Sequence, residues 1–261
     1  MQQLSLPEIP PLEGFREAYL LHLADTTLIL SQRNSEWCGH GPVLEQDIAI
    51  TNISLDLLGQ SRNFYQYAAN LINLSTKSTQ STEDSLAYLR TEREYGNLLM
   101  VELPKGDWGF TVLRQYLFSQ FQFLLFEQLQ LNKDGQLAGI CAKALKEIKY
   151  HLRWSSEWVI RLGDGTEESH GRMQHALNEL WCYTGEMFIP AAFEKETGID
   201  FTAVKNQWTE KVTAVLSEAT LNLPQNIFMH TGGKEGRHTE NLGFILAEMQ
   251  YIQRTYPGCE W

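Results

Sequence analysis

The spacing of the prolines constrains the fold of this chain more than any other feature of its sequence. Eight of the 261 residues are proline, and the two longest proline-free stretches run over 43–103 and 105–189. A proline inside a helix removes a backbone donor and clashes with the preceding turn, so stretches without proline permit long uninterrupted helices. Every proline except Pro190 falls where a helix is expected to break.

The hydrophobic pattern also indicates long helices. From Leu44 onward, apolar residues recur at steps of three and four, which places them on one stripe of a helix of about seven turns. The stripe consists of Ile50, Ile53, Leu57, Phe64, Tyr67 and Leu71, with Gln60 in the remaining slot. Similar stripes predict long helices over 15–33, 107–131 and 136–162, and shorter helices are expected over 82–101, 166–193, 202–219 and 239–254. Thr166 and Thr239 are the predicted N-caps of the helices that they begin.

These patterns predict an all-α fold, because no stretch of consequence alternates apolar and polar residues as a strand would. The fold is a long-helix bundle with additional shorter helices, in a single domain over 1–261. We expect 1–11 to be an extended N-terminal segment. The stretch 74–83 is rich in serine and threonine and is expected to be a loop.

The charge balance excludes several classes of partner. Lysine and arginine number 21 against 32 aspartates and glutamates, a net charge of −11. Binding to nucleic acid or to an anionic membrane needs concentrated positive charge, so neither is expected. No run of 18 apolar residues and no basic-then-apolar leader occurs, which predicts a cytoplasmic protein. The four cysteines form no C-x-x-C pair and are expected to be free thiols.

Helix bundles of this length often hold two iron or manganese ions, with a Glu on each of two helices and Glu-x-x-His on each of the other two. The pattern Glu-x-x-His occurs here as Glu167 to His170 and as Glu235 to His238. Both lie in glycine-rich connections outside the long apolar stripes. We interpret them as chance matches at helix starts rather than as metal ligands.

Four acids lie near the stripes, and one imidazole follows them. No histidine stands three residues after Asp56 or Glu147, where the motif requires one; His151 is four residues after Glu147. Hydrogen bonds and neighbouring lysines or arginines are expected to satisfy these acids, because a buried unpaired charge is costly. The alternative is an altered metal site. Its candidate ligands are Asp25, Asp56, Glu127, Glu147 and His151.

Other catalytic patterns are missing or incomplete. The chain has no Gly-x-Ser-x-Gly, and Thr231-Gly232-Gly233-Lys234 lacks the hydroxyl residue and the preceding strand of a phosphate-binding loop. Cys38 and His40 share a glycine-rich turn, which we interpret as structural. The sequence therefore predicts no catalytic residue.

Several segments resemble a known family. They are 31–33, 36–40, 52–64, 146–153, 231–234, 238–243 and 246–254, with Asn52-Ile53-Ser54-Leu55-Asp56-Leu57-Leu58-Gly59-Gln60-Ser61-Arg62 as the longest motif. Together they resemble the non-catalytic, ferritin-like C subunits of phenylacetyl-CoA epoxidase (ring 1,2-monooxygenase) complexes. The resemblance covers nearly the whole chain and is weakest over the first dozen residues and 191–203.

The resemblance implies a ferritin-like fold and a structural role in aerobic phenylacetate degradation. In that family a sister subunit holds the di-iron site that activates O2 and epoxidises the ring of phenylacetyl-CoA. A reductase with NADPH, FAD and iron-sulfur centres supplies the electrons. The resemblance thus implies that this chain pairs with the di-iron catalytic subunit and binds no cofactor itself.

The resemblance also implies a substrate contact. Arg93-Glu94-Tyr95-Gly96-Asn97 resembles a stretch of the family that borders the acyl-CoA. Glu94, Tyr95, Gly96 and Asn97 are therefore candidates for contact with phenylacetyl-CoA at the subunit interface. The simpler interpretation is an ordinary exposed helical segment with Tyr95 packed on its neighbour.

Three hypotheses of function follow. The chain is a structural subunit of the oxygenase, a ferritin-like oxidase with its own altered metal site, or a free-standing acyl-CoA-binding module. We favour the first, because the long helices lack the imidazoles that a di-iron site needs.

Overall fold

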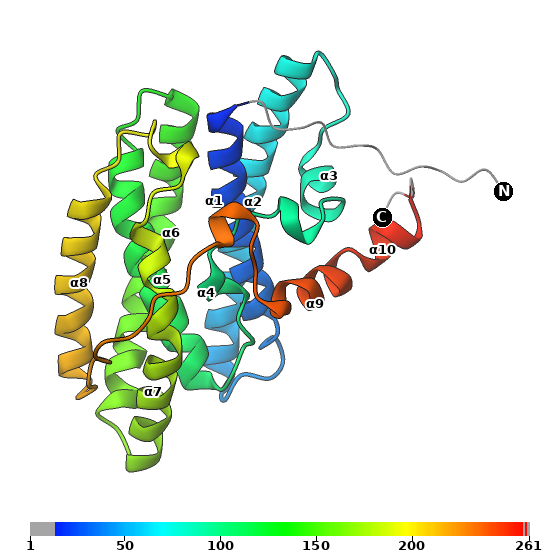
Figure 1. The fold of residues 1–261 in the computed structure, drawn as a ribbon. Helices are drawn as coiled ribbons and strands as arrows, with labels where there is room; N and C mark the ends of the chain where they lie inside the picture. The colour runs from blue at the N-terminus through cyan, green and yellow to red at the C-terminus, as the bar shows by residue number, and fades with distance from the viewer. Residues whose placement is uncertain (1–13, 258, 260–261) are drawn as a thin grey trace.

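The described part of the molecule is a bundle of helices. The computed structural model describes residues 14–257 and 259, which form α-helices and short 3-10 helices and include no strand (Figure 1). Most connections are short, but a long connection over 219–239 separates α8 from α9 and contains only one 3-10 helix. The four longest helices are α1 (Phe15–Ser35), α2 (Leu44–Thr76), α5 (Trp108–Leu129) and α6 (Gly135–Gly163). They pack in two pairs, α1 on α2 and α5 on α6, and the pairs meet where α2 contacts α6. The predicted all-α long-helix bundle is confirmed.

The long helices lie close to their predicted bounds, but α2 is longer than expected. It has 33 residues and continues to Thr76. The Thr76 hydroxyl donates to the carbonyl of Ile72 at 2.7 Å, so this polar end still completes a helical turn. Lys77 then leaves the helix in the left-handed conformation, with φ of 53°. The loop predicted over 74–83 is therefore limited to 77–82, and the prediction for 1–11 lies outside the described residues.

The prediction of one helix over 82–101 is wrong. This stretch contains α3 (Glu83–Tyr88), the 3-10 turn η1 (Glu92–Glu94) and α4 (Leu99–Glu102). Between them the backbone is extended at Tyr95, with ψ of 144°. Gly96 uses its N–H and its carbonyl for contacts with α1 instead of helical bonds. Tertiary contacts override the local helix preference here.

The other short helices match their predictions in part. The predicted helix 202–219 is α8 (Phe201–Glu218), whereas 166–193 contains only α7 (Glu167–Leu180) before the turns η2 (Trp181–Tyr183), η3 (Gly185–Phe188) and η4 (Ala192–Glu194). The predicted helix 239–254 divides at Gln250 into α9 (Glu240–Met249) and α10 (Tyr251–Thr255). Thr166 and Thr239 do cap α7 and α9, each accepting a backbone N–H with its hydroxyl.

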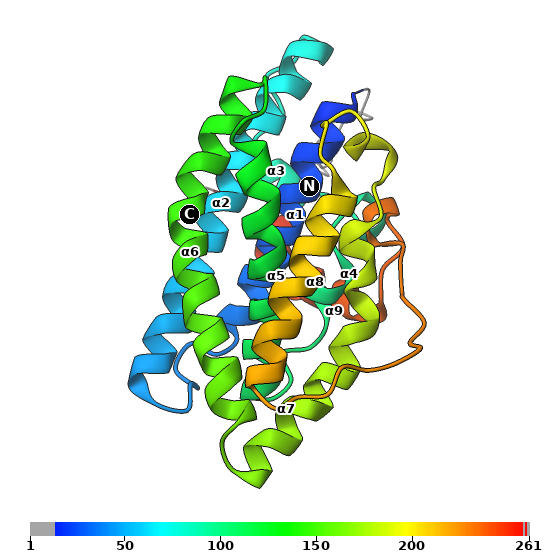
Figure 2. The same cartoon turned by 90° about the vertical axis from the view of Figure 1, so that its left-hand side faces the viewer.

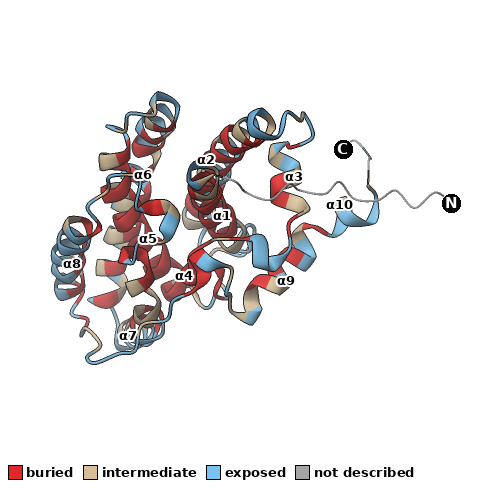
Figure 3. Cartoon of the chain, turned by 45° about the horizontal axis from the view of Figure 1, so that its top comes forward, coloured by how far each residue is buried: buried red, intermediate tan, exposed pale blue. Residues whose placement is uncertain are grey.

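The core lies between the helix pairs, with a second layer on one side. Phe64 of α2 meets Phe126 of α5 edge to face at 5.9 Å, and both are fully buried. α7 and α8 pack against α5, while α9 and α10 lie beyond α1 on the other side of the bundle (Figures 1 and 2). On α2 and α6, buried residues follow the inner side and exposed residues the outer side, whereas α1 and α5 are buried along nearly their whole length (Figure 3). Burial of this apolar surface is the main driving force of folding.

None of the helices in the described ranges is both long enough and apolar enough to cross a membrane.

Candidate functional site

Neutral amides occupy the centre of the four long helices. Gln122 of α5 donates through Nε2 to Oε1 of Gln60 on α2 at 2.9 Å, and Gln60 donates to Glu147 of α6 at 2.9 Å. Further along, Asn34 of α1 donates to Gln115 of α5 at 2.7 Å. These side chains cross-link the bundle in the way that bridging metal ions would, but amides carry no charge to balance a metal pair.

The five candidate metal ligands do not meet at one place. Glu127 is exposed on α5. His151, which is fully buried on α6, lies with Nε2 3.0 Å from the half-exposed carboxylate of Asp56 on α2. Glu147 accepts from Gln60, and Asp25 of α1 faces an arginine. Each of the buried or half-buried acids therefore has its own hydrogen-bonding partner.

This donor set does not fit a pair of metal ions. In 14–257 and 259, no three side chains of His, Cys, Asp or Glu are grouped so that they could hold an ion. The two Glu-x-x-His matches are also separate from the bundle centre: His170 is near the carbonyl of Gly163, at 2.8 Å, in the first turn of α7, and His238 is bound to another glutamate. The absence of metal from the purified chain stays a prediction, which metal analysis of the protein in solution tests.

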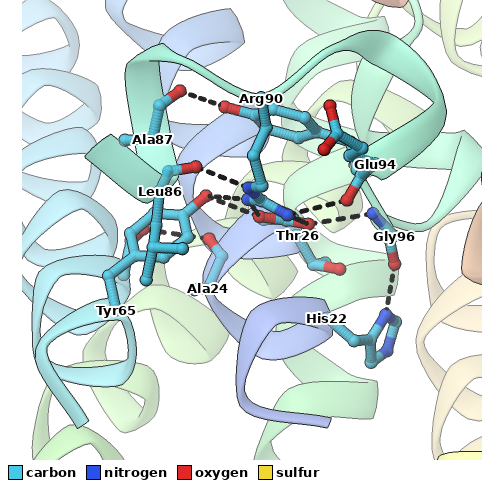
Figure 4. A network of polar contacts seen from close by, with 12 residues as sticks. His22, Ala24, Thr26, Tyr65, Leu86, Ala87, Arg90, Glu94 and Gly96 are labelled. Atoms are coloured by element: carbon cyan, nitrogen blue, oxygen red, sulfur yellow. Dashed lines mark hydrogen bonds and ion pairs between the residues drawn. The ribbon is translucent and has the colours of Figure 1, made fainter. Parts of the chain in front are cut away.

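Asp25 is the centre of a buried polar network, and Figure 4 shows its partners Tyr65, Arg90 and Gly96. Its carboxylate is fully buried and accepts from the guanidinium of Arg90, from the Tyr65 hydroxyl at 2.5 Å and from the Gly96 N–H at 2.9 Å. Burial opposes the charge of Arg90, but Asp25 together with Tyr65 and Tyr95 outweighs that effect, and the pKa of the guanidinium is raised. A carboxylate with this many donors has no lone pair that points freely toward a metal.

The segment 94–97 is part of the same network. The Tyr95 ring is buried beneath the guanidinium of Arg90, 4.4 Å from its centroid, and the Tyr95 hydroxyl donates to the carbonyl of Ala87. Asn97 is fully buried and donates to Glu102 at 2.8 Å. Glu94 is exposed and accepts from the Thr91 N–H at 2.6 Å. The expectation of an exposed helical segment is therefore wrong from Tyr95 onward, since the backbone is extended there and Tyr95 and Asn97 are buried.

A cavity of about 390 Å³ lies beside this segment and is lined in part by Glu94, Tyr95 and Gly96. His22 lines it from α1, and burial lowers the pKa of the His22 imidazole below its usual range. Arg93 also lines it; this residue is exposed and has no ion pair among the described residues. A larger cavity of about 880 Å³ at the start of α1 contains none of the predicted site residues.

Glu186 anchors the loop that carries Thr231-Gly232-Gly233-Lys234. Its buried carboxylate accepts from the N–H groups of Gly232 and Gly233, at 2.8 and 2.7 Å, and from that of Leu99 at 2.8 Å. Burial raises the pKa of Glu186, and the three backbone donors oppose that rise. A side chain at Gly233 would place its Cβ 2.3 Å from the carbonyl oxygen of Asn97, so only glycine fits. The backbone N–H groups of this motif bind an anion, as those of an anion-binding loop do, but the anion here is the carboxylate of Glu186 in the same chain.

His238 and Glu102 fasten the end of the same loop. The two nitrogens of the His238 ring lie 2.9 Å from Glu102 and 2.8 Å from the carbonyl of Tyr95, and both oxygens are acceptors, so the contacts favour the doubly protonated ring. Burial lowers the pKa of His238, but the hydrogen bond and the charge of Glu102 outweigh it, and the pKa is raised. The loop is thus attached to the bundle by a buried ion pair.

This ion pair predicts a dependence of stability on pH. A histidine whose pKa is raised by folding contributes stability that is fully present below its ordinary pKa of 6.5 and is lost as the pH rises through its pKa in the folded state. A pKa that folding raises by one corresponds to about 1.4 kcal/mol. The wild type is expected to be more stable than His238→Asn below pH 6.5. We expect this difference in the free energy of unfolding, measured by urea titration, to shrink as the pH rises from 6.5 through the raised pKa of His238. A difference that stays constant from about pH 6 to about pH 9 would contradict the assignment.

Sequence reasoning missed the role of the titratable residues that hold this region together. They are His22, Arg90, Glu102, Glu186, Glu194, Lys234 and His238. Glu102 did carry a signal, because it interrupts the apolar run Leu98-Leu99-Met100-Val101-Glu102-Leu103. An acid in such a run is expected to be buried with a partner. Identifying that partner requires the fold, since His238 is 136 residues away.

Comparison with known proteins identifies the family of this chain. A model of the family described as "Phenylacetic acid catabolic protein" matches residues 16–261. The chain is 49% identical over 249 residues to the C subunit of the 1,2-phenylacetyl-CoA epoxidase of Escherichia coli (strain K12), covering 94% of this chain and 98% of that protein. The resemblance found in the sequence is therefore confirmed, and the chain belongs to the phenylacetic acid catabolic protein family.

Proposed function

We propose that this chain is the structural, non-catalytic subunit of a phenylacetyl-CoA epoxidase. In this role it pairs with and stabilises the di-iron catalytic subunit during aerobic phenylacetate degradation. The identity of 49% to the C subunit of such an epoxidase supports membership of the complex. The role within the complex rests on the chemistry of the bundle centre.

The observation that carries the proposal is the link of Gln122 to Gln60 at the middle of the long helices. A di-iron site needs several carboxylates there, because their charge balances the metal ions and their oxygens bridge them. An amide in place of a carboxylate removes that charge and leaves a hydrogen bond between helices. The bundle keeps its shape by this means without a metal.

The cofactors of the reaction then belong to other chains. We place the di-iron centre in the catalytic partner and NADPH, FAD and iron-sulfur centres in a reductase, and none of them in this chain. All four cysteines are free thiols, in line with a reducing compartment such as the cytoplasm. No observation favours the alternative, a ferritin-like oxidase. Asp25, Asp56 and Glu147 are its candidate ligands that are buried or half-buried, and each of them has a separate partner.

Co-expression with the catalytic subunit tests the proposal. Size exclusion is expected to give one complex that contains both chains, and the catalytic subunit alone is expected to have a lower Tm than in the complex. Independent elution of the two chains, with equal Tm values, would refute the structural role. Calorimetry of the isolated chain with phenylacetyl-CoA tests the hypothesis of a free-standing acyl-CoA-binding module, and we expect no tight binding.

We further propose that this chain contacts the substrate through the cavity beside 94–96. Tyr95 and Asn97 are committed to internal contacts, whereas Arg93 lines the cavity and is available for the phosphates of an acyl-CoA. Arg93→Ala is expected to raise the KM of the reconstituted complex for phenylacetyl-CoA about threefold or more, since an exposed charge contact is worth up to roughly 1 kcal/mol. The matched control is Arg172→Ala, on α7 outside this cavity. An unchanged KM in the Arg93 variant would end the proposal of a substrate contact.

A further inference from the structure

The outward face of α2 carries apolar side chains that nothing in the described chain covers. Leu44, Ile48 and Leu55 are 72%, 51% and 60% exposed, and their spacing places them on one side of the helix. Leu58 is beside them and is 39% exposed. Single exposed leucines are normal, but an apolar stripe over about four helical turns is typical of a binding surface.

Gly59 lies on the same stripe, one turn after Leu55. It is exposed in the interior of a 33-residue helix, and a Cβ built on it would meet no atom within 4 Å. Nothing in the described chain therefore requires a glycine there, and glycine is among the poorest helix formers. Gly139 of α6 and Gly171 of α7 are also exposed and free of contacts, so a glycine alone marks no interface. Gly59 differs from them because it lies on an exposed apolar stripe, where a glycine allows the backbone of another chain to come close.

The neighbouring helix α6 presents unpaired positive charge. Lys143, Lys146, Lys149 and Arg153 are all exposed, and none forms an ion pair with another described residue. Their spacing places them on the outer side of α6, where Glu157 is also exposed. The partly exposed acids Glu147 of α6 and Asp56 of α2 lie where the two helices meet. The chain as a whole has a net charge of −11, so the composition does not predict a surface on which cations outnumber acids.

The two features form one surface, because α2 and α6 lie side by side (Figure 2). Gln46 of α2 accepts from the Trp154 indole of α6 at 3.0 Å, and Gln60 of α2 donates to Glu147 of α6. The apolar stripe of α2 and the cations of α6 thus lie on neighbouring helices, with the pairs Asp56–His151 and Gln60–Glu147 where the helices meet. We call this surface, formed by Leu44, Ile48, Leu55, Gly59, Lys146 and Arg153, the α2–α6 face.

We propose that the α2–α6 face binds an acidic amphipathic helix of the catalytic partner, whose backbone approaches most closely at Gly59. The apolar side of that helix would cover Ile48 and Leu55 on α2, and its carboxylates would pair with Lys146 and Arg153. A second copy of this chain is a poorer occupant, because a twofold pair would bring the cations of α6 toward each other. This inference rests on the proposed function and adds to it where the partner binds.

The glycine gives a test in which the two expected effects have opposite signs. Gly59→Ala is expected to raise the Tm of the isolated chain by about 2–4 °C, because alanine favours the helix and meets no neighbour. The same change is expected to weaken binding to the purified catalytic subunit about tenfold, because the added methyl group obstructs the close approach. The matched control is Gly171→Ala on α7, which is also exposed and also free of contacts. It should raise Tm without affecting binding.

Charge reversal tests the other half of the surface. Lys146→Glu with Arg153→Glu is expected to weaken binding about a hundredfold and to reduce its sensitivity to salt, because like charges would then face each other. The control is Lys205→Glu with Lys211→Glu, two exposed cations on α8. Circular dichroism of each variant checks that it is folded.

If Gly59→Ala and the α6 double variant bind the catalytic subunit as the wild type does, the proposed face is wrong. The proposed function would survive that result, since it is tested by whether the wild-type chains form a complex at all. If the isolated wild-type chain is dimeric and Gly59→Ala makes it monomeric, the occupant is a second copy, and the proposal is overturned in favour of that pairing.

Discussion

Replacing Arg90 by methionine is expected to lower the free energy of unfolding by about 3–5 kcal/mol, because the change leaves a buried carboxylate without its counter-ion. Asp25 is fully buried, and Arg90 is its ion-pair partner from a segment 65 residues further along the chain. The same guanidinium also donates to the carbonyls of Leu86 and Glu94, at 2.6 and 2.8 Å. The variant therefore loses the charge balance and the contacts that shape the segment after α3.

Urea denaturation of the purified chain measures this effect, and two controls separate its causes. Asp25→Asn combined with Arg90→Met removes both charges, so part of the lost stability is expected to return. Arg62→Ala removes an exposed ion pair to Glu83, at 3.4 Å, and is expected to cost less than about 1 kcal/mol. If Arg90→Met costs no more than Arg62→Ala, the network around Asp25 does not stabilise the fold.

Glu186→Ala is the second large effect that we expect, with a loss of roughly 3 kcal/mol or more. Three backbone N–H groups, those of Leu99, Gly232 and Gly233, would lose their acceptor. A buried donor without an acceptor costs about 1–3 kcal/mol, and water that enters the space reduces the sum. The loop around Gly233 is then expected to detach from the bundle.

Denaturation combined with limited proteolysis measures this second effect. Cleavage of the Glu186→Ala variant is expected between 224 and 239 at protease concentrations that leave the wild type intact. Glu186→Gln keeps one acceptor oxygen, so its susceptibility to the protease is expected to lie between those of the wild type and Glu186→Ala. Glu179→Ala, an exposed acid on α7 near His175, serves as the control. Equal proteolysis of Glu186→Ala and Glu179→Ala would show that the carboxylate does not hold the loop.

The architecture is predictable where local pattern decides it. The stripe that begins at Leu44 and the proline-free stretches fix α2 and the other long helices, because the apolar side of a long helix must be buried. The same reasoning fails over 82–101. There, long-range contacts of Arg90 and Gly96 with α1 decide the conformation, and no local pattern encodes a partner 65 or 71 residues away.

The candidate site is predictable in part. The sequence shows that no imidazole follows Asp56 or Glu147 at the spacing of the metal motif, and the structure adds that these two acids have separate partners, His151 and Gln60. The link between Gln60 and Gln122 depends on the register of α2 against α5, which the sequence does not reveal. The acyl-CoA contact of 94–97 stays a prediction, now restricted to the cavity that this segment lines.

We propose that this chain supports a di-iron subunit without holding iron itself. The most direct measurement is the iron content of each chain after the purified complex is separated under conditions that retain metal, together with the activity of each fraction. The account predicts that iron stays with the catalytic subunit, that this chain contains less than about a tenth of an equivalent, and that it does not turn over phenylacetyl-CoA. About two irons in this chain, with epoxidation in the absence of the other subunit, would contradict it.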